Sequence, residues 1–172
     1  MGVMPVNKLL VTMSLPIVIS MLIQAIYNLV DSVFVAQINP DALTAVGMAF
    51  PMQSLMIAFQ TGLGVGMNAL VSRYLGQKKP YEAGLAATHA LILTALNYVI
   101  FLIVGLTAIP AFFSIQTHSE IIAGYGVEYL SIVCCGSLGL FFQIYGERIL
   151  QATGKTLLSM VSQILGAVIN IV

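Results

Sequence analysis

Long apolar runs separated by short polar segments dominate this chain. Crossing the ~30 Å hydrocarbon core of a bilayer takes roughly 20 helical residues. The runs are continuously apolar rather than alternating, and most are more than twice as long as the ~10-residue strand of a membrane barrel. The pattern therefore predicts an all-α, polytopic transmembrane helix bundle of about four to five spans. These cover about residues 9–36, 43–75, 86–110 and 121–146, with a fifth over 156–172 that is still apolar where the sequence stops.

The composition supports a membrane location. Only 7% of the residues are charged and 59% are hydrophobic, whereas a soluble domain carries roughly 25% charged residues. A surface with so few charges cannot be kept in water, and the lipid bilayer is the expected partner. These numbers exclude a soluble enzyme, a nucleic-acid binder and a disordered tail.

The positions of the charges predict an orientation. The segment before the first span, the second connection and the fourth connection hold all six basic residues, which are Lys8, Arg73, Lys78, Lys79, Arg148 and Lys155. The first and third connections hold Asp41, His118 and Glu120 but no Lys or Arg. Because Lys and Arg accumulate in cytoplasmic loops, we expect the N-terminus to be cytoplasmic in a multi-pass protein of the cell membrane.

Asp31 is the candidate for chemistry because it lies deep in the first span. Gln24, Asn28 and Asp31 are spaced i, i+4 and i+7, so they share one helical face, and Ser20 extends that face inward. A carboxylate within a span is costly and usually faces a bundle interior or a watery cavity. It could carry a proton or bind Na⁺. The alternative is that Asp31 lies close enough to the interface to be merely solvated.

Three further residues in spans bear on the same cavity. Pro16 weakens the first span fifteen residues before Asp31, which allows either a hinge or a static kink. Gln163 and Asn170 lie seven apart on one face of the fifth run and could line the cavity beside Asp31.

Other polar and small residues favour structural interpretations. Gly62 and Gly66 form a G-x-x-x-G spacing, which predicts close approach of another helix. Glu147 and Arg148 are interpreted as a pair at the cytoplasmic boundary of the fourth span, so no basic residue is expected in the interior of a span.

Signals of catalysis are weak. Gly154-Lys155-Thr156 ends like a phosphate-binding loop, but Ile149 stands where that loop needs its first glycine. Cys134 and Cys135 are adjacent rather than spaced as a metal or redox pair. We therefore expect no enzyme activity, no cofactor and no certain metal site, although Na⁺ at Asp31 and Asn170 is one alternative.

Several strings resemble the multidrug and toxin extrusion (MATE) family. The first span carries Pro16 followed by Gln24-Ala25-Ile26-Tyr27-Asn28-Leu29-Val30-Asp31, and the second opens on Ala45-Val46-Gly47 and ends on Ser72-Arg73-Tyr74-Leu75-Gly76. The fourth connection, Arg148-Ile149-Leu150-Gln151-Ala152-Thr153-Gly154, resembles the family's cytoplasmic arginine–glycine signature, and Asn170-Ile171-Val172 resembles the start of its fifth-helix motif.

This resemblance implies an antiporter that exports drugs or metabolites against H⁺ or Na⁺. Asp31 would be the coupling residue of the N-terminal lobe, with Asn170 beside it in the same cation-responsive network. The expected lining residues of the cavity are Gln24, Tyr27, Asn28 and Gln163, and the expected substrate is a small cationic or amphipathic molecule. Residues 1–172 would form part of one lobe, so a C-terminal lobe is the expected partner.

Two alternatives remain. One is a lipid-linked oligosaccharide flippase of the same superfamily, which a cavity ringed with Arg and Lys would favour because lipid pyrophosphate requires cations. The other is a non-transporting, truncated membrane fragment. The absence of basic residues from the interior of the predicted spans disfavours the flippase.

Overall fold

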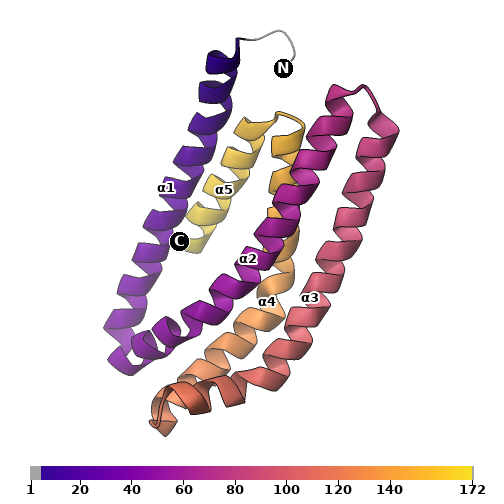
Figure 1. Cartoon of the computed structure of the whole chain (residues 1–172). Coiled ribbons are helices and arrows are strands. Elements are labelled where there is room, and N and C mark those ends of the chain that lie inside the picture. Colours follow the sequence, from indigo (N-terminus) through magenta and orange to yellow (C-terminus); the bar gives the residue numbers. More distant parts are fainter. Residues whose placement is uncertain (1–4, 172) are drawn as a thin grey trace.

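The computed structural model describes residues 5–171, apart from the side chains of residues 38, 170 and 171. Every element in this range is an α-helix, as predicted, and consecutive helices run antiparallel through short connections (Figure 1). The helices are α1 (Val6–Ile38), α2 (Pro40–Gly76), α3 (Pro80–Gln116), α4 (Glu120–Ala152) and α5 (Thr156–Ile171).

The helices extend beyond the apolar runs. Helices α1 to α4 contain 33 to 37 residues each and have the length and composition to cross a membrane, whereas α5 is shorter. Helix α3 does not end at Pro110, where the third span was expected to end, but continues to Gln116. A proline removes one backbone hydrogen bond of the helix and kinks it, and it need not terminate it.

Local sequence sets the helix ends. Asn39 lies between α1 and α2, and its side chain accepts a hydrogen bond from the backbone N–H of Asp41 at 2.9 Å. Prolines open both α2 and α3, where the missing N–H costs nothing. The turn before α5 contains Gly154 with a φ of 79°, a left-handed conformation that glycine adopts without strain.

The core lies among α2, α3 and α4, while α1 packs chiefly against α5 (Figure 1). One cluster of buried residues joins the three core helices away from the α2–α3 turn, and a second lies closer to that turn. The first contains Ala49, Met56, Phe101, Ile109, Phe113, Leu130, Cys134 and Phe141, and the second contains Met67, Val71, Ala83, Ala90 and Ala152.

A buried hydrogen-bond network also links these three helices. The amide nitrogen of Gln60 in α2 donates to the hydroxyl of Thr94 in α3 and to the carbonyl oxygen of Phe141 in α4, each at 3.1 Å. Its amide oxygen accepts from Asn97 at 3.2 Å. Gln60 and Thr94 are fully buried, and a polar group inside a bundle is stable there only because it is hydrogen-bonded.

The glycines that allow close helix packing are not the predicted ones. A Cβ atom at Gly62 or Gly66 would meet nothing within 4 Å in the part of the chain that the structure describes. The close approaches occur at Gly64 against α4, at Gly105 against Cys134 and at Gly126 against the ring of Phe113. The spacing of Gly62 and Gly66 was therefore misleading, because the rotation of α2 presents the face of Gly64 to α4.

Candidate functional site

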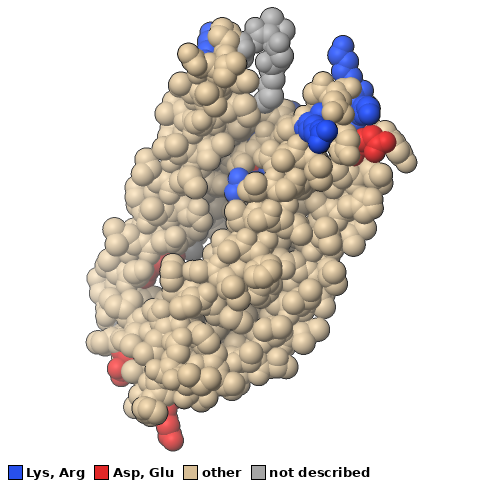
Figure 2. All heavy atoms as spheres, viewed as in Figure 1, with Lys and Arg blue, Asp and Glu red and all other residues tan. Residues whose placement is uncertain are grey.

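A cavity of about 460 Å³ lies between α1, α2, α4 and α5. Its volume falls in the range of small-molecule sites. Figure 2 shows a hollow between α1 and α2, with a blue side chain inside it. Polar side chains make up much of the lining, and they are Ser20, Gln24, Tyr27, Thr61, Gln143, Glu147, Arg148, Gln151, Thr156, Ser159 and Gln163.

The structure brings three of the predicted lining residues together. Gln24 and Tyr27 of α1 and Gln163 of α5 all line the cavity, together with Ser20. Ser20 is buried, and its hydroxyl donates to the carbonyl oxygen of Pro16 at 2.9 Å. The polar stripe on α1 thus faces the space that α5 closes from the other side.

Asn28 and Asp31 lie beyond this lining. Asp31 is seven residues, or about two helical turns, past Gln24 and so lies on the same face of α1; it is half-buried, whereas Asn28 is exposed. Asn28 was expected among the lining residues. Asn28 is not among the residues that line the cavity in the described part of the chain, so its place in the lining stays a prediction.

Asn170 belongs to the last turn of α5, and its side chain lies outside the part of the chain that the structure describes. Among the described residues, no group of three or more His, Cys, Asp and Glu side chains is arranged to hold a metal ion. The adjacent cysteines are unpaired thiols, Cys134 buried in the core and Cys135 exposed.

Arg148 and its neighbour Glu147 line the cavity, which the sequence analysis did not predict. Helix α4 runs on to Ala152, so Glu147 and Arg148 are both helical residues that line the cavity. Arg148 is the one Lys or Arg among the described residues of this lining, while the other basic residues include those gathered at the α2–α3 turn (Figure 2). A repeat of polar residues could have revealed this wall, because Gln143, Glu147 and Gln151 recur every fourth position and share one face of α4.

A glycine on α2 makes room for this arginine. A Cβ atom at Gly64 would lie 2.9 Å from Cγ and 3.7 Å from Cβ of Arg148, and 3.6 Å from Cγ2 of Ile144. The aliphatic part of the Arg148 side chain therefore lies directly against the α2 backbone.

The hydrogen bonds of the cavity wall leave two polar atoms without a partner. Nη1 of Arg148 donates to Oε1 of Gln151 at 2.9 Å, and Nε2 of Gln143 donates to Oε1 of Glu147 at 3.2 Å. Nε of Arg148 and Oε1 of Gln163 are buried and have no hydrogen-bond partner within the described part of the chain. In that same part, no carboxylate forms an ion pair with Arg148.

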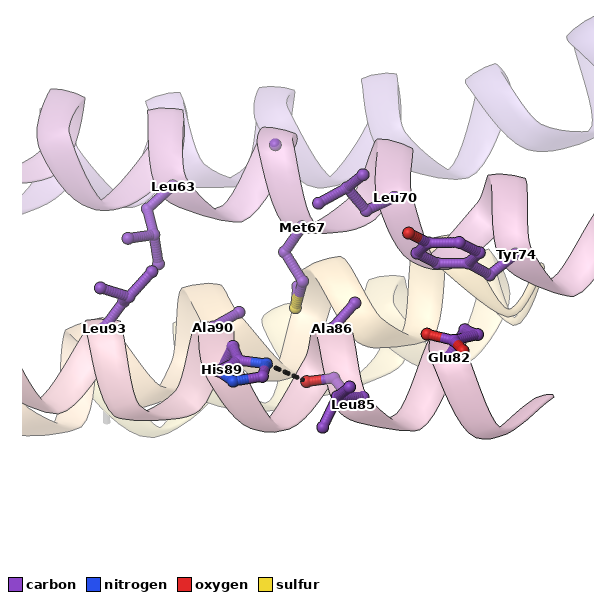
Figure 3. Close-up of a pocket in the computed structure, with 11 residues that line it drawn as sticks. Leu63, Met67, Leu70, Tyr74, Glu82, Leu85, Ala86, His89, Ala90 and Leu93 are labelled. Atoms are coloured by element: carbon purple, nitrogen blue, oxygen red, sulfur yellow. Dashed lines mark hydrogen bonds between the residues drawn. The ribbon is translucent and has the colours of Figure 1, made fainter. Parts of the chain in front are cut away.

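A second concave surface lies between α2 and α3 (Figure 3). Its lining is mainly apolar, with Leu63 of α2 facing Leu93 of α3 and Met67 of α2 pointing toward Ala86 and Ala90 of α3. His89 is its histidine, and the ring nitrogen Nδ1 lies 2.9 Å from the carbonyl oxygen of Leu85. This groove is separate from the residues predicted to carry function.

Comparisons with known proteins identify the family. Residues 16–172 match the model of the MatE family. The FAD transporter of Shewanella oneidensis is 26% identical over 98% of this chain. The multidrug export protein MepA of Staphylococcus haemolyticus is 26% identical over 96% of it. The chain spans 37% of the length of each of these relatives.

Solved structures agree in fold. A MOP superfamily transporter from Pyrococcus furiosus, described as having a binding pocket of reverse polarity, superposes with a TM-score of 0.91 at 32% identity, over 95% of this chain and 36% of that one. The MATE multidrug transporter DinF-BH superposes with a TM-score of 0.92 at 29% identity, over 99% of this chain and 39% of that one.

These matches bear on the earlier predictions. The all-α transmembrane bundle and the resemblance to the MATE family are confirmed, and members of this family are transporters rather than enzymes. The chain is a multi-pass membrane protein that belongs to the MatE family of transporters.

Proposed function

We propose that this chain forms part of the N-terminal lobe of a transporter that exports small organic molecules in exchange for H⁺ or Na⁺. The observation that carries the proposal is the polar cavity between α1, α2, α4 and α5, in a chain that matches the MatE family. The names of the relatives, a FAD transporter and a multidrug export protein, support movement of small molecules across a membrane. Their greater length supports a further lobe as the partner of this one.

In this proposal Asp31 binds the coupling cation. It is half-buried on the cavity face of α1, beyond Gln24. Protonation or Na⁺ binding would remove the cost of a bare carboxylate within the membrane. The cation can drive export only if its affinity for Asp31 differs between two packings of the lobe. Asn170, in the last turn of α5, would contribute an amide to the same network.

Pro16 is the proposed hinge of α1. It is buried where α1 meets its neighbours, and its ring leaves the carbonyl oxygen of Thr12 without its usual helical donor. The half of α1 that carries Asp31 could then bend relative to the cytoplasmic half. The orientation with a cytoplasmic N-terminus and the location in the cell membrane are further parts of this proposal.

The flippase alternative gains one observation, because a basic residue, Arg148, lines the cavity. A single arginine is not a ring of basic residues, so export of small molecules remains the proposed function. Efflux by the full-length protein would argue against the alternative of a non-transporting membrane fragment.

The decisive variant is Asp31→Asn in the full-length transporter. Efflux of a fluorescent substrate from cells or proteoliposomes is measured under a proton gradient alone and under a Na⁺ gradient alone. We expect the variant to lose gradient-driven efflux at least about tenfold. The amide of asparagine is not protonated near neutral pH, and it has no negative charge to neutralise a bound Na⁺. Asp41→Asn is the matched control, since Asp41 is exposed in the first turn of α2. Equal efflux by the Asp31→Asn variant and the wild type contradicts the coupling role.

A further inference from the structure

We propose that Arg148 binds an anionic group of the transported molecule, a phosphate or a carboxylate, at the cytoplasmic end of the cavity. This inference rests on the proposed function. It narrows the exported small organic molecules to those that carry a negatively charged group. The first support is position. Arg148 stands one helical turn before the end of α4 and lines a 460 Å³ cavity together with residues of three other helices.

The second support is an uncompensated charge. Nη1 of Arg148 is engaged by the neutral amide of Gln151, and Nε has no acceptor. Within the described chain no carboxylate pairs with the guanidinium. Charged residues that face a cavity between membrane-spanning helices are rare and often mark a pathway for ions or substrates. A guanidinium presents a planar fork of donors that matches phosphate and carboxylate oxygens.

The third support is the way in which the side chain is held. Gly64 lets the aliphatic part of Arg148 lie against α2, and Gln151 orients one end of the guanidinium from one turn further along α4. A side chain fixed in this way loses less entropy when it binds a ligand than a free surface arginine would.

The rest of the wall limits the ligand. Glu147 is the acidic residue among the described residues that line the cavity, and it accepts a hydrogen bond from Gln143. A molecule that is negative throughout would be repelled by Glu147. The unpartnered Oε1 of Gln163 is an acceptor on the α5 side. The structure therefore favours a polar molecule with one anionic group and with hydrogen-bond donors elsewhere.

Phosphate chemistry is tested by binding, which does not require transport. The full-length transporter is purified in detergent, and its melting temperature is measured with inorganic pyrophosphate and with chloride at equal ionic strength. We expect pyrophosphate to raise the melting temperature of the wild type and its apparent Kd to weaken at least about tenfold in Arg148→Gln, the scale of one charge-assisted hydrogen bond. Arg148→Lys should retain part of the effect. Lys155→Gln is the matched control, because it removes one exposed charge outside the cavity.

Two further arms separate the sources of the anion. Vesicles of phosphatidylcholine with and without phosphatidic acid test a lipid headgroup, and riboflavin 5′-phosphate compared with riboflavin tests a soluble organic phosphate.

If pyrophosphate stabilises the wild type and Arg148→Gln equally, the inference is wrong. It is also wrong if Arg148→Gln melts lower without ligand and pyrophosphate has no effect on the wild type, since Arg148 then pairs with another part of the protein. Asp31→Asn tests the proposed function and Arg148→Gln tests this inference. Pyrophosphate binding that depends on Arg148 would support the inference even if Asp31→Asn kept normal efflux. Loss of coupled efflux in Asp31→Asn would support the proposed function even if pyrophosphate did not bind.

Discussion

Gly64 of α2 and Arg148 of α4 fit together, because a Cβ atom on residue 64 would lie 2.9 Å from Cγ of the arginine. The contact places the one arginine of the described cavity lining against the backbone of a neighbouring helix. A substitution at residue 64 should therefore displace the Arg148 side chain without changing any charge.

Gly64→Ala should therefore displace Arg148 and weaken pyrophosphate binding about as much as Arg148→Gln does. The extra methyl group also overpacks the α2–α4 contact, at a cost of about 1–3 kcal/mol. The measurement is the melting temperature with and without pyrophosphate. Gly62→Ala is the control, since nothing lies within 4 Å of its added Cβ. A normal pyrophosphate response in Gly64→Ala would show that the arginine tolerates the methyl group in place.

Gly126→Ala should destabilise the contact between α3 and α4. The new Cβ atom would overlap the ring of Phe113, and Phe113 is completely buried. We expect a loss of about 1–3 kcal/mol in the free energy of unfolding, because the ring has no free space into which to move. Chemical denaturation in detergent measures the change. The control Gly124→Ala adds the same methyl group where nothing lies within 4 Å, and a similar loss in both variants would contradict the packing argument.

Gln60→Leu should weaken the association of all three core helices. The change removes three hydrogen bonds, to Thr94, Asn97 and the carbonyl oxygen of Phe141. Hydrogen bonds between membrane helices average about 0.6 kcal/mol, so we expect a loss of about 1–2 kcal/mol in unfolding free energy. Gln53→Leu serves for comparison because Gln53 makes one such bond, to the hydroxyl of Tyr129. An equal or smaller effect at Gln60 would argue against the network.

Pro16→Ala should stabilise α1 and slow transport if Pro16 is a hinge. Alanine restores the backbone N–H that the proline lacks and removes the clash with the preceding turn. Unfolding free energy and efflux by the full-length transporter are measured together. Pro51→Ala and Pro110→Ala are matched controls, since both prolines are exposed and lie inside helices. Unchanged efflux in Pro16→Ala would identify a static kink.

Periodicity along the helices predicted part of the cavity lining on α1 and α5. The stripe from Ser20 through Gln24 on α1 faces the cavity because a helix of 3.6 residues per turn keeps those positions on one side. Gln163 faces the same space for the same reason. Asn28 lies one turn further along α1 than Gln24 and is not among the described lining residues.

The sequence by itself determined that this protein is an all-helical membrane bundle, since apolar runs of these lengths have no other stable arrangement across a bilayer. It also determined which face of α1 is polar. Only the tertiary structure decided that Gly64 rather than Gly62 and Gly66 meets α4, and that Arg148 lines the cavity. The physical reason is that both outcomes depend on how far α4 extends and how α2 is rotated against it, and these are set by packing between helices distant in the chain.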